Sequence, residues 1–161
     1  MPTVSRPSLL LLCALGLAAP ACAGPRVNTP AGFATLGDDD HFSYRAASAE
    51  GVVLAVRVER NRPEGNLAFW SRVVDERMQS RGYVPDGDAR PVQSADGLAG
   101  TQYRYRVAHQ GRAHRYWVAV FVKPGGFLSR SRVYVVEAGG DQEVFDPAAA
   151  AVERAMASFR R

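Results

Sequence analysis

The sequence predicts an α+β fold, in which an antiparallel β-sheet carries two main helices packed on it. Three observations support this fold class. Several segments alternate apolar and polar residues, two segments repeat apolar residues at helical spacing, and 47 % of the 161 residues are hydrophobic against 22 % charged. This balance is typical of a globular domain, and the length suits one domain with its own core.

Residues 1–23 have the pattern of a secretory signal peptide. Arg6 precedes an apolar block from Leu9 to Ala19, and small residues then follow up to Gly24. The block is too short for a permanent membrane span, which needs roughly 20 apolar residues. We therefore expect an exported protein of the bacterial envelope, either in the periplasm or anchored to a membrane as a lipoprotein.

Two alternative cleavage sites fit the end of this signal. A cut after Ala23 follows the small-residue pattern Ala-Cys-Ala, whereas a cut before Cys22 allows lipidation of that cysteine. Residues 19–22 resemble a bacterial lipobox, although the leucine favoured three places before the cysteine is absent. Because the sequence from Gly24 onward contains no cysteine, we favour lipidation of Cys22, which would bind the domain to the membrane through acyl chains.

The rest of the chain divides into a short tether and one α/β domain. Residues 24–32 contain two prolines and two glycines, which favour a flexible tether. Residues 33–161 then form the domain. Alternating or β-branched segments predict strands at 41–47, 52–60, 91–94, 100–109, 112–123 and 131–138.

A two-residue turn at Gln110-Gly111 joins two of these strands into a hairpin. This turn fixes the register of the pair, placing Arg104 opposite Trp117 and Arg106 opposite Arg115.

Two helices are expected on the sheet. The first begins after an N-cap at Asn66 and ends at Gly82. Its apolar stripe consists of Leu67, Trp70, Val74 and Met78. The second is predicted to start at Asp146 as N-cap and Pro147 as first helical residue, and to repeat Val152, Met156 and Phe159.

This order of elements resembles the PsbP-like (Mog-type) α/β/α sandwich family, in its bacterial exported lipoprotein branch. The local cues are Phe42-Ser43-Tyr44, Trp70, Gly82-Tyr83, residues 135–138 and residues 157–159. The resemblance implies an α/β/α sandwich with a non-enzymatic binding or assembly role. It supplies no catalytic motif that could be carried over.

One face of the predicted hairpin combines Arg104, Arg106 and Arg115 with Trp117. Guanidinium forks and an aromatic platform suit an anionic or glycan ligand. Arg57 is a further candidate for this face. The alternative, taken as the default, is a structural charge ladder in which Glu59 or Glu137 separates the opposed Arg106 and Arg115.

Other candidate sites favour ordinary structural interpretations. Consecutive side chains in the turn Asp38–His41 point in different directions, so we expect a solvated turn and no metal. The strand aromatics Tyr103, Tyr105, Tyr116 and Phe121 are expected to fill a core rather than line a pocket.

No catalytic motif is visible, and we expect neither a catalytic residue nor a cofactor. None of His41, His109 and His114 lies in a serine-centred elbow, and phosphate- and dinucleotide-binding fingerprints are absent from the sequence. A dispersed net charge of +4 also argues against nucleic acid as a partner. The sequence therefore favours an exported, lipid-anchored binding or assembly module whose partner is an envelope protein or a small anionic or glycan ligand. A hydrolase is the less favoured alternative.

Overall fold

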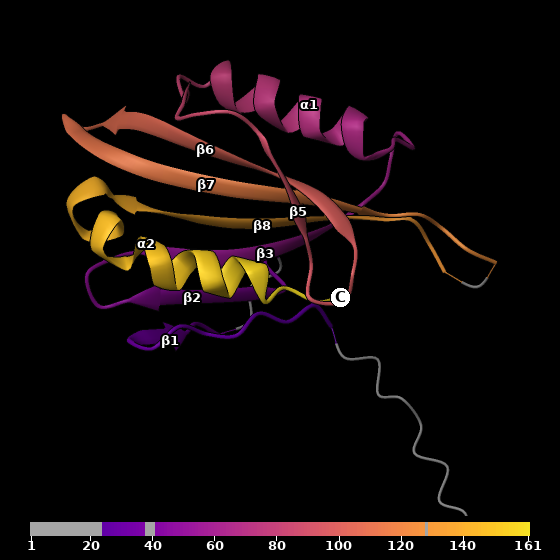
Figure 1. Cartoon of the computed structure of the whole chain (residues 1–161), viewed down its shortest axis with the longest axis horizontal. Helices are drawn as coiled ribbons and strands as arrows, with labels where there is room; N and C mark the ends of the chain where they lie inside the picture. The colour runs from indigo at the N-terminus through magenta and orange to yellow at the C-terminus, as the bar shows by residue number, and fades with distance from the viewer. Residues whose placement is uncertain (1–23, 38–40, 128) are drawn as a thin grey trace, which may run out of the picture.

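The computed structural model describes residues 24–37, 41–127 and 129–161. Eight strands form one antiparallel sheet in the order β1-β2-β3-β8-β7-β6-β4, and β5 also pairs with β6 (Figure 1). The strands are β1 (Phe33–Thr35), β2 (Tyr44–Ser48), β3 (Val53–Arg60), β4 (Val84–Pro85), β5 (Arg90–Gln93), β6 (Ala99–His109), β7 (Arg112–Lys123) and β8 (Arg132–Asp141). The predicted α+β class is thereby confirmed. The signal sequence, Cys22 and residues 38–40 of the acidic turn lie outside the described residues.

The β6–β7 hairpin has the predicted register. Arg104 lies opposite Trp117, and Arg106 lies opposite Arg115. Both turn residues have positive φ, 51° at Gln110 and 76° at Gly111, as a tight two-residue hairpin turn requires.

Helix α2 (Gln142–Ala157) covers one face of the sheet, against β7 and β8. Its buried residues are Phe145, Val152, Ala155 and Met156. They join a core with inward residues of the strands, in which the rings of Phe145 and Trp117 meet edge to face at 5.0 Å between centroids.

The predicted start of α2 is wrong by several residues. Asp141 is the N-cap, and its side chain accepts a hydrogen bond from the backbone N–H of Glu143 at 3.0 Å. Strand β8 continues through Gly139 and Gly140 up to Asp141, so the helix follows the strand directly. Pro147 therefore lies inside the helix, and Asp146, expected as the cap, is free to pair with a sheet arginine.

Helix α1 (Leu67–Gln79) lies on the opposite face and contacts β4, β6 and β7. Its cap is as predicted: the side chain of Asn66 accepts a hydrogen bond from the N–H of Phe69 at 2.9 Å. Ser71 is the one fully buried residue within α1. The stripe residues pack half-buried against Tyr105, Val118 and Val120 of the sheet. With a helix on each face, the arrangement is an α/β/α sandwich.

The segment expected as a flexible tether is instead attached to the domain from Arg26 to Asn28. Arg26 and Arg160 exchange two backbone hydrogen bonds of 2.8 and 3.0 Å, and the N–H of Asn28 donates to Ser158 Oγ. Val27 between them is buried in the α2-side core. This pairing depends on the main chain of Arg160, which the composition of the segment could not indicate.

Across the described parts of the chain, neither helix has the length and apolar character needed to cross a membrane.

Candidate functional site

The four residues predicted as a ligand face do lie together, on the α2 side of the sheet. Arg104 stacks on Trp117, with the guanidinium carbon 4.0 Å from the ring centroid, and its Nη2 lies 2.5 Å from the Glu153 carboxylate of α2. This guanidinium is therefore held between an indole ring and a carboxylate of the same domain.

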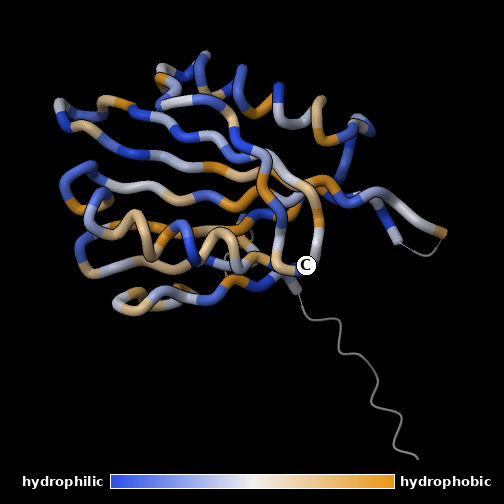
Figure 2. Tube along the Cα trace, in the orientation of Figure 1, coloured by the Kyte–Doolittle hydropathy of each residue, from blue (hydrophilic) through white to orange (hydrophobic). Residues whose placement is uncertain are grey.

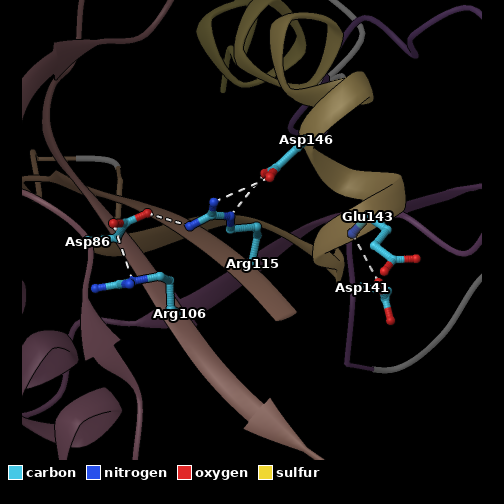
Figure 3. A network of polar contacts seen from close by, with 6 residues as sticks. All are labelled: Asp86, Arg106, Arg115, Asp141, Glu143 and Asp146. Atoms are coloured by element: carbon cyan, nitrogen blue, oxygen red, sulfur yellow. Dashed lines mark hydrogen bonds and ion pairs between the residues drawn. The ribbon is translucent and has the colours of Figure 1, made fainter. Parts of the chain in front are cut away.

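The two opposed arginines share an aspartate (Figure 3). Arg115 Nη1 donates to Asp86 at 2.7 Å, and Arg106 Nε lies 3.4 Å from the other oxygen of Asp86. The Nε of Arg115 also donates to Asp146 of α2 at 2.9 Å. The hydrogen bond that Arg115 donates to Asp146 raises the pKa of Arg115 above its ordinary value, although partial burial opposes its charge.

These contacts favour the charge ladder over a ligand site on this face. The acid between Arg106 and Arg115 is Asp86, so the expectation that Glu59 or Glu137 takes this place is wrong. Arg57 is not part of this face either, because it pairs with Glu137 on the other side of the sheet.

The α1 side of the sheet carries an open groove of about 630 Å³ beside the helix. Helix α1 lies over β6 and β7 and leaves the region of β2 and β3 uncovered (Figure 1). Apolar and small residues of β3 and β8 line its floor, among them Val53, Ala55 and Gly139. A Cβ at Gly139 would approach the Tyr116 ring to 3.1 Å, so glycine keeps the floor low at this point.

The walls of the groove are aromatic and its rim is basic. Phe42, Tyr83 and Tyr116 supply rings, and the rings of Tyr83 and Tyr116 meet edge to face at 5.2 Å. The basic side chains that line it are Arg45, Arg81, His109 and His114, whereas Arg115 contributes only backbone because its guanidinium pairs with Asp146 on the α2 side. Such a combination of apolar surface and a few polar groups is typical of small-molecule sites.

A buried carboxylate lies in the groove. Glu137 is 8 % exposed, and its Oε2 accepts hydrogen bonds from Arg57 Nη2, at 2.5 Å, and from the hydroxyl of Tyr116. Burial and the negative charge of Glu137 raise the pKa of Tyr116 well above its ordinary value, so the phenol stays a hydrogen-bond donor. Pairing with Glu137 likewise raises the pKa of Arg57, outweighing the opposing effect of burial.

The strand aromatics divide between the core and the groove. Tyr105 and Phe121 are fully buried, as expected, whereas Tyr116 lines the groove. No cluster of three or more His, Cys, Asp or Glu side chains with metal-binding geometry occurs among the described residues.

Sequence reasoning missed the groove because its position depends on where α1 lies across the sheet. Residues 52–60 form a near-continuous apolar run, which is typical of a strand covered on both faces, so this pattern does not indicate the open groove. The one available signal was the placement of Arg57 on the second face of that strand, which implied a polar partner there.

No protein-family model matches the chain, and no curated protein matches it. Its fold is shared with solved structures of other proteins. One is LpqN of Mycobacterium tuberculosis, described as involved in cell envelope biogenesis, with a TM-score of 0.69 and 10 % identity over 84 % of this chain and 81 % of LpqN.

Another is PA94 of Pseudomonas aeruginosa, a protein of unknown function described as a putative regulator. It matches with a TM-score of 0.57 and 10 % identity over 88 % of this chain and 87 % of its own. At this identity the likeness is one of fold, and the resemblance to the PsbP-like family stays a prediction.

Proposed function

We propose that this protein is an exported, non-enzymatic binding module of the bacterial cell envelope, and that it holds a small ligand in the groove beside α1. The observation that carries the proposal is the groove itself. It exposes an apolar floor and aromatic walls on the part of the α1 face that helix α1 leaves uncovered.

The lining favours an organic anion with a flat apolar part. Arg45 and Arg81 give the rim positive charge and the two histidines add polar ring nitrogens, while the Glu137 charge is already countered by Arg57. An apolar body would cover Val53 and Ala55, and its acidic group would lie at the rim.

The envelope location is supported by the secretory pattern of residues 1–23. The fold shared with LpqN, which is described as involved in cell envelope biogenesis, agrees with this location. Lipidation of Cys22 belongs to the same proposal, because it would retain the module at a membrane.

The groove chemistry favours binding over catalysis. Its described lining contains no serine, threonine or cysteine that could act as a nucleophile. Its carboxylate is engaged at one oxygen by both Arg57 and Tyr116. Turnover that survives repurification and disappears in Glu137→Gln would contradict a purely binding role.

The test uses 1-anilinonaphthalene-8-sulfonate, an aromatic anion of the proposed class whose fluorescence rises in apolar sites. We expect saturable binding of one molecule to the folded wild type. Val53→Trp and Val107→Trp would fill the groove and lower the affinity about tenfold, a loss of about 1.4 kcal/mol. The matched control is Val84→Trp, because Val84 is 55 % exposed and lies outside the groove.

Equal titrations for all four proteins would contradict the proposal. Circular dichroism on each variant separates loss of the groove from loss of the fold. Native mass spectrometry of wild type and Val107→Trp purified from the envelope then reports whether a natural ligand occupies the same place.

A further inference from the structure

The hairpin between β7 and β8 ends in an apolar tip that projects from the domain (Figures 1 and 2). Gly126 and Ser129 close the turn through backbone hydrogen bonds of 2.9 and 3.1 Å. Phe127 is fully exposed, whereas the next most exposed large hydrophobic residues in the described part of the chain, Val84 and Leu36, are 55 % and 42 % exposed. A phenylalanine presented in this way at the end of a projection is a candidate contact for another surface.

A row of three cations lies at the base of this hairpin. Arg132 of β8 is opposite Arg60 of β3 on one side and opposite Lys123 of β7 on the other. Like charges placed directly opposite one another cost stability. Within the described residues no ion pair relieves this row, in contrast to Arg106 and Arg115, which share Asp86.

The surrounding sequence strengthens the positive charge. Arg62 and Arg130 bring the basic residues in 59–65 and 122–132 to five, against the two acidic residues Glu59 and Glu64. This end of the sheet therefore complements an anionic surface.

The base of the hairpin is fixed by a buried polar network. Asn61, 7 % exposed, donates to Ser131 Oγ at 2.8 Å and accepts from the indole N–H of Trp70 at 2.5 Å. Ser131 in turn donates to the carbonyl of Lys123 at 3.0 Å. The network joins both strands of the hairpin to α1, so the tip has a defined direction.

The described chain also begins at this end of the molecule. Residue 24 lies near the C-terminus, on the side from which the hairpin projects, because Arg26 pairs with Arg160 (Figure 1). Cys22, the predicted lipid attachment, precedes Gly24 by only two residues.

We propose that this end of the domain docks on an anionic lipid bilayer, with Phe127 inserted at the interface and Arg60, Lys123 and Arg132 against headgroup phosphates. Aromatic insertion combined with basic residues is the usual chemistry of peripheral membrane binding. The contact is independent of the groove, so it goes beyond the proposed ligand site. It would also hold the groove in a fixed orientation to the membrane.

The test is vesicle co-sedimentation with the full chain carrying Cys22→Ser, exported and cut by the host, so that no acyl chain contributes. Vesicles of phosphatidylglycerol and phosphatidylcholine are compared with phosphatidylcholine alone at about 0.1 M salt, where the Debye length is about 10 Å. We expect binding to the anionic vesicles only.

Two variants separate the parts of the surface. The triple change Arg60→Gln, Lys123→Gln and Arg132→Gln should lower partitioning onto anionic vesicles roughly tenfold to a hundredfold, since each basic residue near such a surface contributes about fivefold. Phe127→Ala should lower it about tenfold. The matched controls are Arg72→Gln, Arg77→Gln and Arg90→Gln together, which remove the same charge elsewhere, and Val84→Ala for the exposed apolar residue.

Failure of the wild type to bind anionic vesicles would overturn the proposal, as would equal losses in variants and controls. Phe127→Trp gives a second readout. Its added indole emission should shift to the blue on anionic vesicles, and an unshifted emission with bound protein would overturn the insertion of the tip.

Discussion

The two faces of the sheet differ in how completely their helices cover them. Helix α2 buries four residues in the larger core, and the charged residues beside it are paired within the domain. Helix α1 buries only Ser71 fully and leaves the groove open beside it.

The residues that stabilise the fold and the residues proposed to bind a ligand therefore lie on different faces of the sheet. The α2 face supplies most of the buried apolar surface that stabilises the fold. The α1 face can therefore leave part of its sheet uncovered without loss of the core. Ligand chemistry is expected on the face that contributes less to folding.

The largest expected effect is on the α2 face. Phe145→Ala removes a fully buried ring packed on Trp117 and should lower the free energy of unfolding by about 3–5 kcal/mol in urea denaturation. Val74→Ala, in the half-buried stripe of α1, should cost only about 1 kcal/mol. A greater loss from the α1 change than from Phe145→Ala would break the comparison.

The second prediction concerns the polar attachment of α1. Asn61→Ala leaves the Trp70 indole N–H and the Ser131 hydroxyl without their buried partner, and should cost about 2–3 kcal/mol. The control Asn66→Ala removes only the exposed cap and should cost about 1 kcal/mol. Equal small losses would mean that α1 is held by its apolar stripe instead.

The third prediction tests the independence of the faces. Arg104→Ala with Arg115→Ala breaks ion pairs to Glu153, Asp86 and Asp146, and should lower the unfolding free energy by about 1–2 kcal/mol. Because these contacts lie on the α2 face, groove affinity for the naphthalene sulfonate should stay within about twofold. A tenfold loss of affinity with an intact fold would place ligand binding on the arginine face.

The smallest effect is a pH dependence at the C-terminus. Arg161 and Ser94 donate to the Asp96 carboxylate, and these bonds lower its pKa below 3.8 although burial alone would raise it. The contribution to stability is therefore present above about pH 4 and is lost as the pH falls through the depressed pKa. Urea denaturation at pH values from 7 to 3 gives the free energy of unfolding of wild type and of Asp96→Asn. The difference between these two free energies should shrink only in the acidic range. A constant difference would mean that the carboxylate charge contributes nothing.

The fold was predictable because its signals are local. Alternation predicted the longer strands, Asn66 marked the start of α1, and the turn Gln110-Gly111 set the hairpin register on which the arginine pairing depends. The helix ends at Gln79 with Ser80 as C-cap, so the end predicted at Gly82 is wrong by three residues. These features require only neighbouring residues and a fixed side-chain period.

The groove and the α2 start depend on long-range placement. Pro147 carries a strong helix-start signal, but Asp141 caps the helix because β8 continues to that residue. Asp86 reaches Arg106 and Arg115 only because β4 pairs with β6 at the sheet edge. The cation row likewise results from the pairing of β3 with β8, two strands distant in the chain.

The most direct measurement is methyl NMR of the folded protein during titration with the naphthalene sulfonate. If the ligand binds on the α1 face, the methyl signals of Val53 and Val107 in the groove shift with a common saturation curve. The signals of Val136 and Val152 in the α2-side core then stay in place. Shifts confined to Val136 and Val152, or a naphthalene sulfonate that leaves all four unchanged, would contradict a binding site on the α1 face.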